Sequence, residues 1–217
     1  MNNILTLFHG YVGVLLDNQG LDAETIEGLV KIKDGARAAS ELMDRTQALV
    51  RPPATIWRDV DLGAFTSILN PQFTALCGPS TKLHVFVPDN LPRVRCDAGR
   101  VKTALFELVK NACEATFASG GDVWIELSGE MPSRGLSAAA QPARWVTIKV
   151  SDAGPGVAPE IRERIFMPFF TTKKKQSAAG LGLAVVEGVV QQHGGVLKLE
   201  SADERTTFTL RLPSRAE

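Results

Sequence analysis

One predicted helix carries an amide and two carboxylates along one edge. Glu107, Asn111 and Glu114 follow one another at spacings of four and three residues, which places them close together on a helical surface. Amide and carboxylate oxygens are ligands that a hard cation prefers, so this edge could hold a divalent metal. For this helix alone, a simpler interpretation is a solvated polar flank in which Glu107 pairs with Lys110.

A second segment, residues 151–156, places a carboxylate at the predicted end of a strand. Asp152 is followed there by Gly154 and Gly156. A carboxylate accepts a hydrogen bond from an exocyclic amine such as that of adenine, and glycines let a planar ligand approach the backbone closely. The alternative is an ordinary turn, because Asp and Gly are common turn residues.

A third segment, residues 178–183, puts Gly180 and Gly182 at the predicted start of a helix. Backbone N–H groups at a helix N-terminus bind phosphate, and glycines leave them accessible. The lysines at 173–175 are either a solvated charge run or counter-ions for that phosphate. A G-x-G pair alone is a weak signal, and the sequence has neither the dinucleotide-binding fingerprint nor the P-loop pattern.

Helices and strands must position these three segments. The pattern of apolar residues along the chain changes at Pro52-Pro53. Before it, two apolar stripes with helical spacing predict two helices, with Asp22 as the N-cap of the second. Two helices alone bury too little apolar surface to be stable. We therefore expect residues 1–51 to form a hairpin that dimerises through residues 1–50 into a four-helix bundle. The alternative is a hairpin packed on its own C-terminal domain.

The second predicted domain, residues 54–217, mixes helices and strands. Asp61 and Asp97 are expected N-caps of two helices, the first running to Leu69 and the second to about Phe117. Strands are expected over residues 83–87, 123–127, 145–150, 196–200 and 206–212, helices around 159–165 and over 181–193, and a surface excursion over 131–144. Because these elements follow no regular βαβ repeat, the predicted fold class is α+β, an α/β sandwich with helices on one face of a sheet.

Composition argues against several classes of protein. The chain has 24 Lys and Arg residues and 24 Asp and Glu residues, so it lacks the positive surplus that a nucleic-acid binder needs for phosphates. No apolar run reaches about 18 residues, so we expect no membrane segment, and the N-terminus lacks the basic start of a signal peptide. Three cysteines without a C-x-x-C pattern indicate reduced thiols in a cytoplasmic protein.

Taken in order, the motifs are more specific than any one of them. The chain reads E-L-V-K-N-A-C-E-A, S-D-A-G-P-G-V, I-F-M-P-F-F-T-T-K, A-G-L-G-L-A-V-V, Q-H-G-G and T-T-F-T-L-R-L-P. This series resembles the ATP-binding domain of sensor histidine kinases, which share a superfamily with gyrase B, MutL and a heat-shock chaperone. The resemblance covers the chain from Ala54 to Pro213.

The resemblance implies ATP and Mg²⁺ as ligands and gives roles to individual residues. Asn111 matches the asparagine that ligates Mg²⁺ between the phosphates, and Glu107 matches an acid that assists metal or proton handling. Asp152 matches the aspartate that reads adenine. Thr206 or Thr207 matches the threonine that supports the adenine pocket through water, and Thr207 is placed in the predicted site. The other positions implied for ATP are Lys110, Gly154, Gly156, Thr171, Thr172, Lys173, Gly180, Leu181, Gly182 and Leu183. An aromatic box that anchors the ATP lid is implied at Phe166, Phe169 and Phe170, and a structural helix end at His193.

The N-terminal hairpin resembles the dimerisation and phosphotransfer domain of nitrogen-regulation-type sensor kinases. That type carries H-[DE]-x-N-N-x-L-T, and this chain begins with Asn2-Asn3-Ile4-Leu5-Thr6. The register places the phospho-accepting histidine three residues before Asn2, upstream of Met1. His9 falls at a different angle on the helix, so we do not expect it to replace that histidine.

The resemblance implies a histidine kinase core of a two-component system. Such a kinase transfers the γ-phosphoryl group of Mg-ATP to a histidine and then to an aspartate in the receiver domain of a response regulator. With the acceptor upstream of Met1, this chain alone is not expected to autophosphorylate. One alternative is a kinase-derived dimeric adaptor or phosphotransfer protein that binds a regulator without autokinase activity. Another is an ATPase or serine kinase of the same superfamily, against which the N-N-x-L-T hairpin argues.

Overall fold

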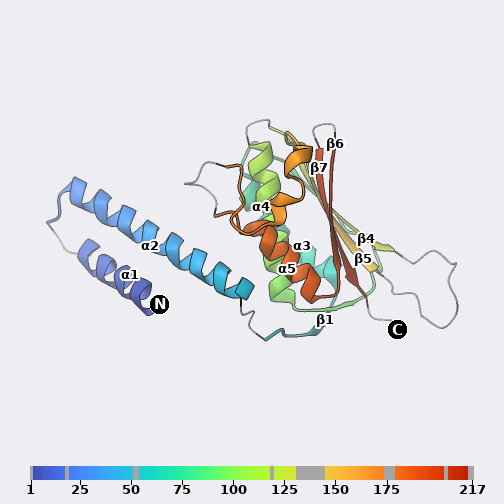
Figure 1. The fold of residues 1–217 in the computed structure, drawn as a ribbon, viewed down its shortest axis with the longest axis horizontal. Helices are drawn as coiled ribbons and strands as arrows, with labels where there is room; N and C mark the ends of the chain where they lie inside the picture. The colour runs from blue at the N-terminus through green and yellow to red at the C-terminus, as the bar shows by residue number, and fades with distance from the viewer. Residues whose placement is uncertain are drawn as a thin grey trace. The chain divides into compact units, whose positions relative to one another are not determined.

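The computed structural model of the chain describes residues 2–17, 20–50, 54–117, 120–130, 145–173, 179–202 and 205–214. The chain divides into two compact units, Met1–Pro53 and Ala54–Glu217 (Figure 1). The surface excursion predicted over residues 131–144 lies outside the described ranges. Among the helices within these ranges, none combines the length and the hydropathy that crossing a membrane requires.

The first unit consists of two helices in contact with each other, α1 (Asn2–Leu16) and α2 (Ala23–Val50). Asp22 caps α2 as predicted, because its Oδ1 accepts a hydrogen bond of 2.7 Å from the backbone N–H of Thr25. That bond holds the pKa of the Asp22 carboxyl below its usual value. Large apolar side chains are exposed on both helices: Leu7, Tyr11, Val14, Leu15, Ile26, Val30 and Ile32. This is the kind of surface that helices bury in a bundle.

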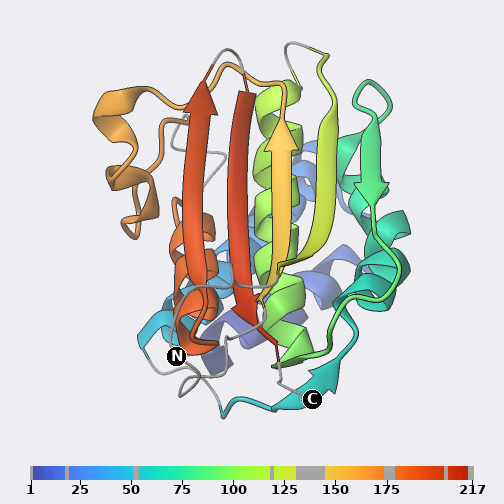
Figure 2. The same cartoon turned by 90° about the vertical axis from the view of Figure 1, so that its right-hand side faces the viewer.

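The second unit is built on a five-stranded sheet in the order β2-β4-β5-β7-β6. Its strands are β2 (Leu83–Phe86), β4 (Val123–Glu130), β5 (Trp145–Asp152), β6 (Val196–Ala202) and β7 (Arg205–Pro213). Strand β2 runs parallel to β4, and the other neighbours are antiparallel. Helices α3 (Leu62–Cys77), α4 (Ala98–Thr116) and α5 (Gly182–Gln192) lie on one side of this sheet (Figure 2). The predicted mixed fold, with helices on one face of a sheet, is confirmed for this unit.

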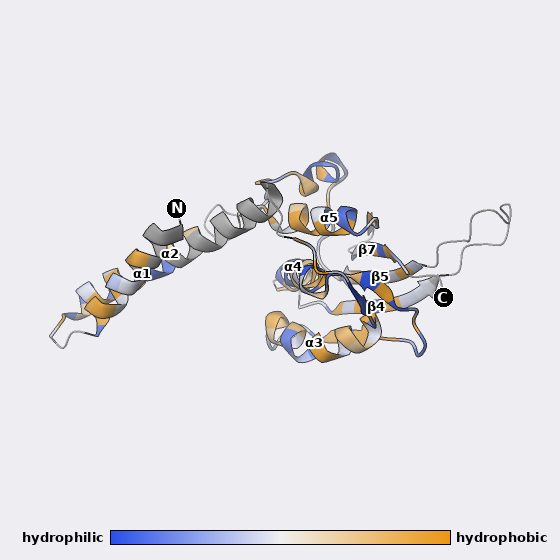
Figure 3. Ribbon diagram, turned by 90° about the horizontal axis from the view of Figure 1, so that it is seen from below, coloured by the Kyte–Doolittle hydropathy of each residue, from blue (hydrophilic) through white to orange (hydrophobic). Residues whose placement is uncertain are grey.

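Alternation along the strands turns one face of the sheet toward the helices. In β6, Leu197 and Leu199 are half-buried, whereas Lys198 between them is exposed. The predicted stripe of α4 is buried at Val101, Ala104, Leu105, Leu108 and Ala112, and half-buried at Ala115. Figure 3 shows hydrophobic residues on the helices and on the strands that they cover. Apolar residues recur every two positions along the strands and every 3.6 positions along the helices, and both sets thus pack into one core.

The structure extends one predicted helix and adds two strands. Helix α3 continues past Leu69 to Cys77, with Pro71 inside it. Strands β1 (Arg58–Val60) and β3 (Val94–Cys96) pair in a small second sheet that the sequence analysis missed. The single short helix expected around residues 159–165 is two 3₁₀ turns, η1 (Pro159–Ile161) and η2 (Arg164–Phe166). Strands of three residues carry too little periodicity to be recognised in a sequence.

The cysteines contradict part of the sequence analysis. Cys77 at the end of α3 and Cys113 on α4 form a disulfide, with their Cα atoms 4.8 Å apart. The prediction of three reduced thiols is therefore wrong for these two. They are separated by 36 residues in the chain, and only the packing of α3 on α4 brings them together, which no local pattern reveals. Cys96 is a free thiol, and burial raises its pKa to about 11.

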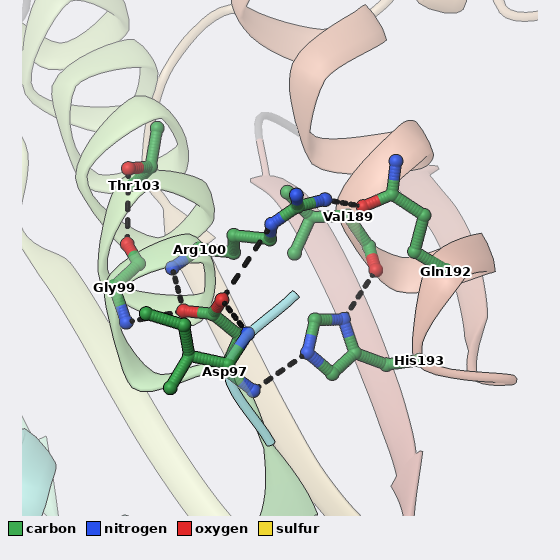
Figure 4. A network of polar contacts seen from close by, with 8 residues as sticks. Asp97, Gly99, Arg100, Thr103, Val189, Gln192 and His193 are labelled. Atoms are coloured by element: carbon green, nitrogen blue, oxygen red, sulfur yellow. Dashed lines mark hydrogen bonds and ion pairs between the residues drawn. The ribbon is translucent and has the colours of Figure 1, made fainter. Parts of the chain in front are cut away.

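A polar network fixes the start of α4 against the end of α5 (Figure 4). Asp97 is the N-cap of α4, and its Oδ1 accepts hydrogen bonds from the N–H groups of Gly99 and Arg100, at 3.0 and 3.2 Å. The N–H of Asp97 donates to Nε2 of His193 at 2.9 Å, and Nδ1 of the same ring donates to the carbonyl of Val189 at 2.7 Å. Because Nε2 accepts, the ring is neutral. The predicted structural role of His193 at the helix end is confirmed.

Candidate functional site

One face of α4 is bracketed by two glycines from other elements. Glu107, Asn111 and Ala115 lie on this face at successive spacings of four residues, about 12 Å from the first to the last. At one end, a Cβ on Gly182 would lie 2.6 Å from Oε2 of Glu107, and at the other, a Cβ on Gly154 would lie 2.8 Å from Cβ of Ala115. Because glycine has no Cβ at either position, the N-terminus of α5 and the turn after β5 both approach α4 closely.

Asp152 is a buried carboxylate at the end of β5, where the sequence predicted it. Only 3% of the residue is exposed, and its Oδ1 accepts a hydrogen bond of 2.9 Å from the N–H of Gly154. Burial raises the pKa of Asp152 to about 6, although the bond from Gly154 acts in the opposite direction. A ligand that donates a hydrogen bond would stabilise the charged form. A buried carboxyl group with such a pKa is a candidate for function.

The register between β5 and β7 decides between the two candidate threonines. Thr206 pairs with Asp152, whereas Thr207 pairs with Ser151. Paired residues of antiparallel strands share a face of the sheet, and successive residues alternate between faces. Thr206 therefore lies on the helix side with Asp152, and Thr207 lies on the opposite side, where its hydroxyl oxygen is 2.9 Å from that of Ser151. The structure thus corrects the predicted site, because Thr206 and not Thr207 lies beside Asp152.

The third glycine segment lies where α5 begins. Gly180 has a φ of +67°, and a Cβ there would lie 2.6 Å from the carbonyl carbon of Phe169, so this position requires glycine. The N-cap residue of α5 is Leu181, which has no side-chain group to cap the helix. N–H groups at such a helix N-terminus attract anions. Leu181 is 1% exposed and Leu183 is half-buried, so a ligand would contact the backbone of Leu181 and not its side chain.

The loop residues that the structure describes between η2 and α5, 170–173 and 179, begin and end at one backbone contact. The N–H of Phe169 donates to the carbonyl of Gly180 at 2.8 Å, while the side chain of Phe169 is exposed. Phe166 packs edge-on against a phenylalanine of β7, and Phe170 packs against the core. Of the three residues in the predicted aromatic box, Phe166 and Phe170 thus pack against the core, and Phe169 contributes its backbone N–H. Together they fix both ends of this loop.

The start of the loop is tied to α4 by charge. Nζ of Lys173 forms an ion pair with the carboxylate of Glu114, and Nζ of Lys110 lies 3.9 Å from the same carboxylate. The partner of Lys110 is therefore Glu114, four residues along α4, and not Glu107 as the polar-flank interpretation had it. The sequence placed Glu114 on the same helix edge, but the residues predicted to bind ATP did not include it.

The two threonines of the loop differ in their surroundings. Oγ1 of Thr171 accepts a hydrogen bond of 3.1 Å from the N–H of Lys173, which fixes the backbone at the lysine. Thr172 is exposed, and the structure does not bring it to the other predicted site residues. Residues 174–178, which include the other two lysines of the run, lie outside the described ranges.

Asn111 and Glu107 supply oxygen atoms along the bracketed face. Asn111 is half-buried, and among the described residues its side-chain amide has no hydrogen-bond partner. Across the described ranges, no three His, Cys, Asp or Glu side chains are grouped to hold a metal ion. Mg²⁺ in nucleotide sites takes only one or two protein oxygens and completes its shell with water and phosphate. The oxygens of Asn111 and Glu107 fit that requirement.

Comparison with known proteins identifies relatives of the whole chain. Residues 96–216 match the family described as histidine kinase-, DNA gyrase B-, and HSP90-like ATPase. The chain is 28% identical over 226 residues to the sensor kinase CckA of Brucella abortus. This alignment covers 100% of this chain and 23% of that protein. It is 33% identical over 179 residues to the sensor histidine kinase ZraS of Salmonella typhimurium. This alignment covers 82% of this chain and 35% of that protein. The chain thus spans about a quarter to a third of the length of these relatives.

Solved structures share the fold. Full-length ShkA in complex with AMPPNP has a TM-score of 0.76 and 24% identity, over 99% of this chain and 44% of that one. The mycobacterial sensor histidine kinase MprB has a TM-score of 0.59 and 23% identity, over 74% of this chain and 100% of that one. The family match covers more than half of the chain. This chain, as its motif series predicts, therefore belongs to the histidine kinase-, DNA gyrase B- and HSP90-like ATPase family, and its relatives are sensor histidine kinases.

Proposed function

We propose that this chain is the ATP-dependent histidine kinase core of a two-component system. It would transfer the γ-phosphoryl group of Mg-ATP to a histidine and then to an aspartate of a response regulator. One observation carries the proposal: Glu107 and Asn111 on α4 lie between the N-terminus of α5 and the turn that follows the buried Asp152. A nucleotide needs an acceptor for its base at one end and a site for anions at the other. This face of α4 has both.

At the base end, Asp152 would accept a hydrogen bond from the exocyclic amine of adenine. The N–H of Gly154 orients the carboxylate for this contact. Thr206 lies beside Asp152 in the next strand, where its hydroxyl would hold a water molecule against the base. Guanine carries a carbonyl where adenine carries the amine and would place an acceptor against the carboxylate. The site is therefore expected to select adenine.

At the phosphate end, the N–H groups at the start of α5 attract phosphate. The ammonium groups of Lys110 and Lys173, which pair with Glu114 toward the other end of this face, would add positive charge to the site. Mg²⁺, when bound, neutralises negative charge between phosphate oxygens. Asn111 and Glu107 would hold it through their side-chain oxygens. Because phosphoryl transfer depends mainly on positioning and charge neutralisation, these residues are expected to determine the rate.

The first unit would dimerise and present the acceptor. Exposed apolar side chains such as Tyr11 and Val14 would be buried between two copies of residues 1–50 in a four-helix bundle. From the resemblance of residues 2–6 to the motif, we expect the acceptor histidine three residues before Asn2, next to the start of α1. The receiver domain of a response regulator would take the phosphoryl group from that histidine.

Phosphoryl transfer is tested by replacing Met1 with a helical His-Glu-Phe extension and supplying γ-labelled ATP with Mg²⁺. The extended chain should acquire acid-labile, base-stable phosphate, and Asn111→Ala in that background should abolish the label. The chain without the extension should stay unlabelled, because a histidine held elsewhere forfeits about 7–11 kcal/mol that proximity supplies.

Two results would change the proposal. Label on the unextended chain that disappears in His9→Gln would show that His9 is the acceptor and that the register is wrong. Failure of the extended chain to bind or transfer from ATP would overturn the kinase and favour a dimeric adaptor that docks a regulator without catalysis.

A further inference from the structure

Both backbone groups of Val157 are held by side chains from elsewhere. Its N–H donates to Oγ of Ser201 in β6 at 2.7 Å, and its carbonyl accepts from Nε of Arg162 at 3.2 Å. Nη2 of Arg162 also donates to the carbonyl of Ser201 at 2.6 Å. Arg162 and Ser201 therefore form one clamp around Val157, which connects the loop after β5 to the far edge of the sheet.

Ser201 belongs to the same row of the sheet as the buried carboxylate. Ser201 pairs with Thr206, and Thr206 pairs with Asp152. Because paired residues share a face, all three side chains lie on the helix side, separated by two strand spacings, about 10 Å. In Figure 2 the segment that follows β5 runs across the end of the sheet toward β6. The clamp thus lies at the end of the sheet where Asp152 lies.

The loop between Asp152 and Val157 is fixed at both ends and has little free space. At its start, Gly154 is bonded to Asp152 and packs against α4. At its end, the backbone at Gly156 has a φ of +78°, and a Cβ there would lie 3.1 Å from Oγ of Ser201. Holding a loop in its bound shape before the ligand arrives removes an ordering cost from binding.

We propose that Ser201 and Arg162 are positioning residues for the adenine end of the site. They hold the turn over residues 153–157 so that Asp152 and the backbone beside it face the base. This role rests on the proposed function, since it concerns binding of an adenine nucleotide. Both residues hold the turn at the proposed adenine end, so the effect of removing them should be the same for every nucleotide that carries adenine.

The test compares variants that differ at the clamp alone. Ser201→Ala and Arg162→Gln should weaken ADP and ATP equally, by about five- to tenfold, which is the effect of losing one or two hydrogen bonds. Ser201→Thr keeps a hydroxyl in a strand and should bind as the wild type does. Ser67→Ala is the control, because it also removes a serine hydroxyl hydrogen-bonded to the backbone, here as the donor to the carbonyl of Gly63 in α3 at 3.0 Å, and it should leave binding unchanged. Affinities are measured by titration calorimetry at a temperature where every variant is folded by circular dichroism.

Hydrogen exchange gives a second measure that needs no nucleotide. The amide of Val157 should exchange faster in Ser201→Ala than in the wild type, and at the wild-type rate in Ser201→Thr. Unchanged affinity in Ser201→Ala, a loss in Ser201→Thr equal to that in Ser201→Ala, or a larger loss for ATP than for ADP would each overturn the positioning role alone. If the wild type binds neither nucleotide, the proposed function fails and the positioning role fails with it.

Discussion

Gly182 at the start of α5 lies against the carboxylate of Glu107 on α4, since a Cβ at Gly182 would be only 2.6 Å from Oε2. A methyl group at this position would have to move the carboxylate of Glu107 or the start of α5. The N-terminus of α4 and the C-terminus of α5 are joined by the hydrogen bond from the N–H of Asp97 to His193. Helix α5 is thus fixed to α4 at both of its own ends, and the proposed phosphate site lies at its N-terminus.

Replacing Gly182 with alanine should therefore damage phosphate binding. The new methyl group would displace Glu107 or the N-terminus of α5, so we expect Gly182→Ala to weaken ATP by about tenfold or more and AMP by less. Gly188→Ala is the matched control, because Gly188 lies in the same helix and a Cβ there would have nothing within 4 Å. The control should bind ATP as the wild type does and gain up to about 1 kcal/mol of stability. Equal ATP affinities for the two variants would contradict the role of this contact.

The buried carboxylate of Asp152 should lower the free energy of unfolding of the ligand-free protein at neutral pH. Burial raises its pKa from the ordinary 3.8 to about 6. Between these values the folded protein holds a proton that the unfolded chain has lost, so this group lowers the free energy of unfolding as the pH rises through that window. Asp152→Asn should remove the cost and stabilise the ligand-free protein at neutral pH by at most about 3 kcal/mol. Urea denaturation at pH values below, within and above the window measures it, and a variant no more stable than the wild type at neutral pH would contradict the buried charge.

The disulfide predicts how many thiols react. In denaturant without reductant, an alkylating reagent should label one cysteine, Cys96, and after reduction it should label three. Closing a loop between Cys77 and Cys113 restricts the unfolded chain, so reduction should lower the free energy of unfolding by about 3–4 kcal/mol. Mass spectrometry counts the labels, and three labels before reduction would show that the bond does not form.

The exposed apolar residues of the first unit predict a dimer. The full chain should be dimeric in light scattering, and Val14→Glu should make it monomeric, because a charge would then replace a side chain that the bundle buries. Removing residues 1–53 should leave a folded monomer, since the second unit has its own hydrophobic core. A full chain that is monomeric at micromolar concentration would contradict the four-helix bundle.

The features that the sequence predicted well are those set by neighbouring residues. The start of α4 follows from Asp97, whose side chain caps the helix within three residues of itself, and the end of β5 follows from alternation up to Asp152. Thr206 and Thr207 could not be separated, because a shift of one residue in the pairing of β7 exchanges the two faces of the sheet. The contact of Ser201 with Val157 spans 44 residues and depends on three strands lying side by side. Such contacts depend on the order of the strands in the sheet, which no sequence motif specifies.

The most direct test of the account is calorimetric titration of the wild-type chain with Mg-ATP at several pH values, with Mg-GTP and Asp152→Asn for comparison. If Asp152 reads adenine as a carboxylate, the wild type should bind Mg-ATP, discriminate against Mg-GTP, and lose affinity as the pH falls through about 6. Asp152→Asn should bind weakly and without that pH dependence. A wild type that binds no adenine nucleotide at millimolar concentration, or that binds ATP and GTP alike with no change across this range, would contradict the account.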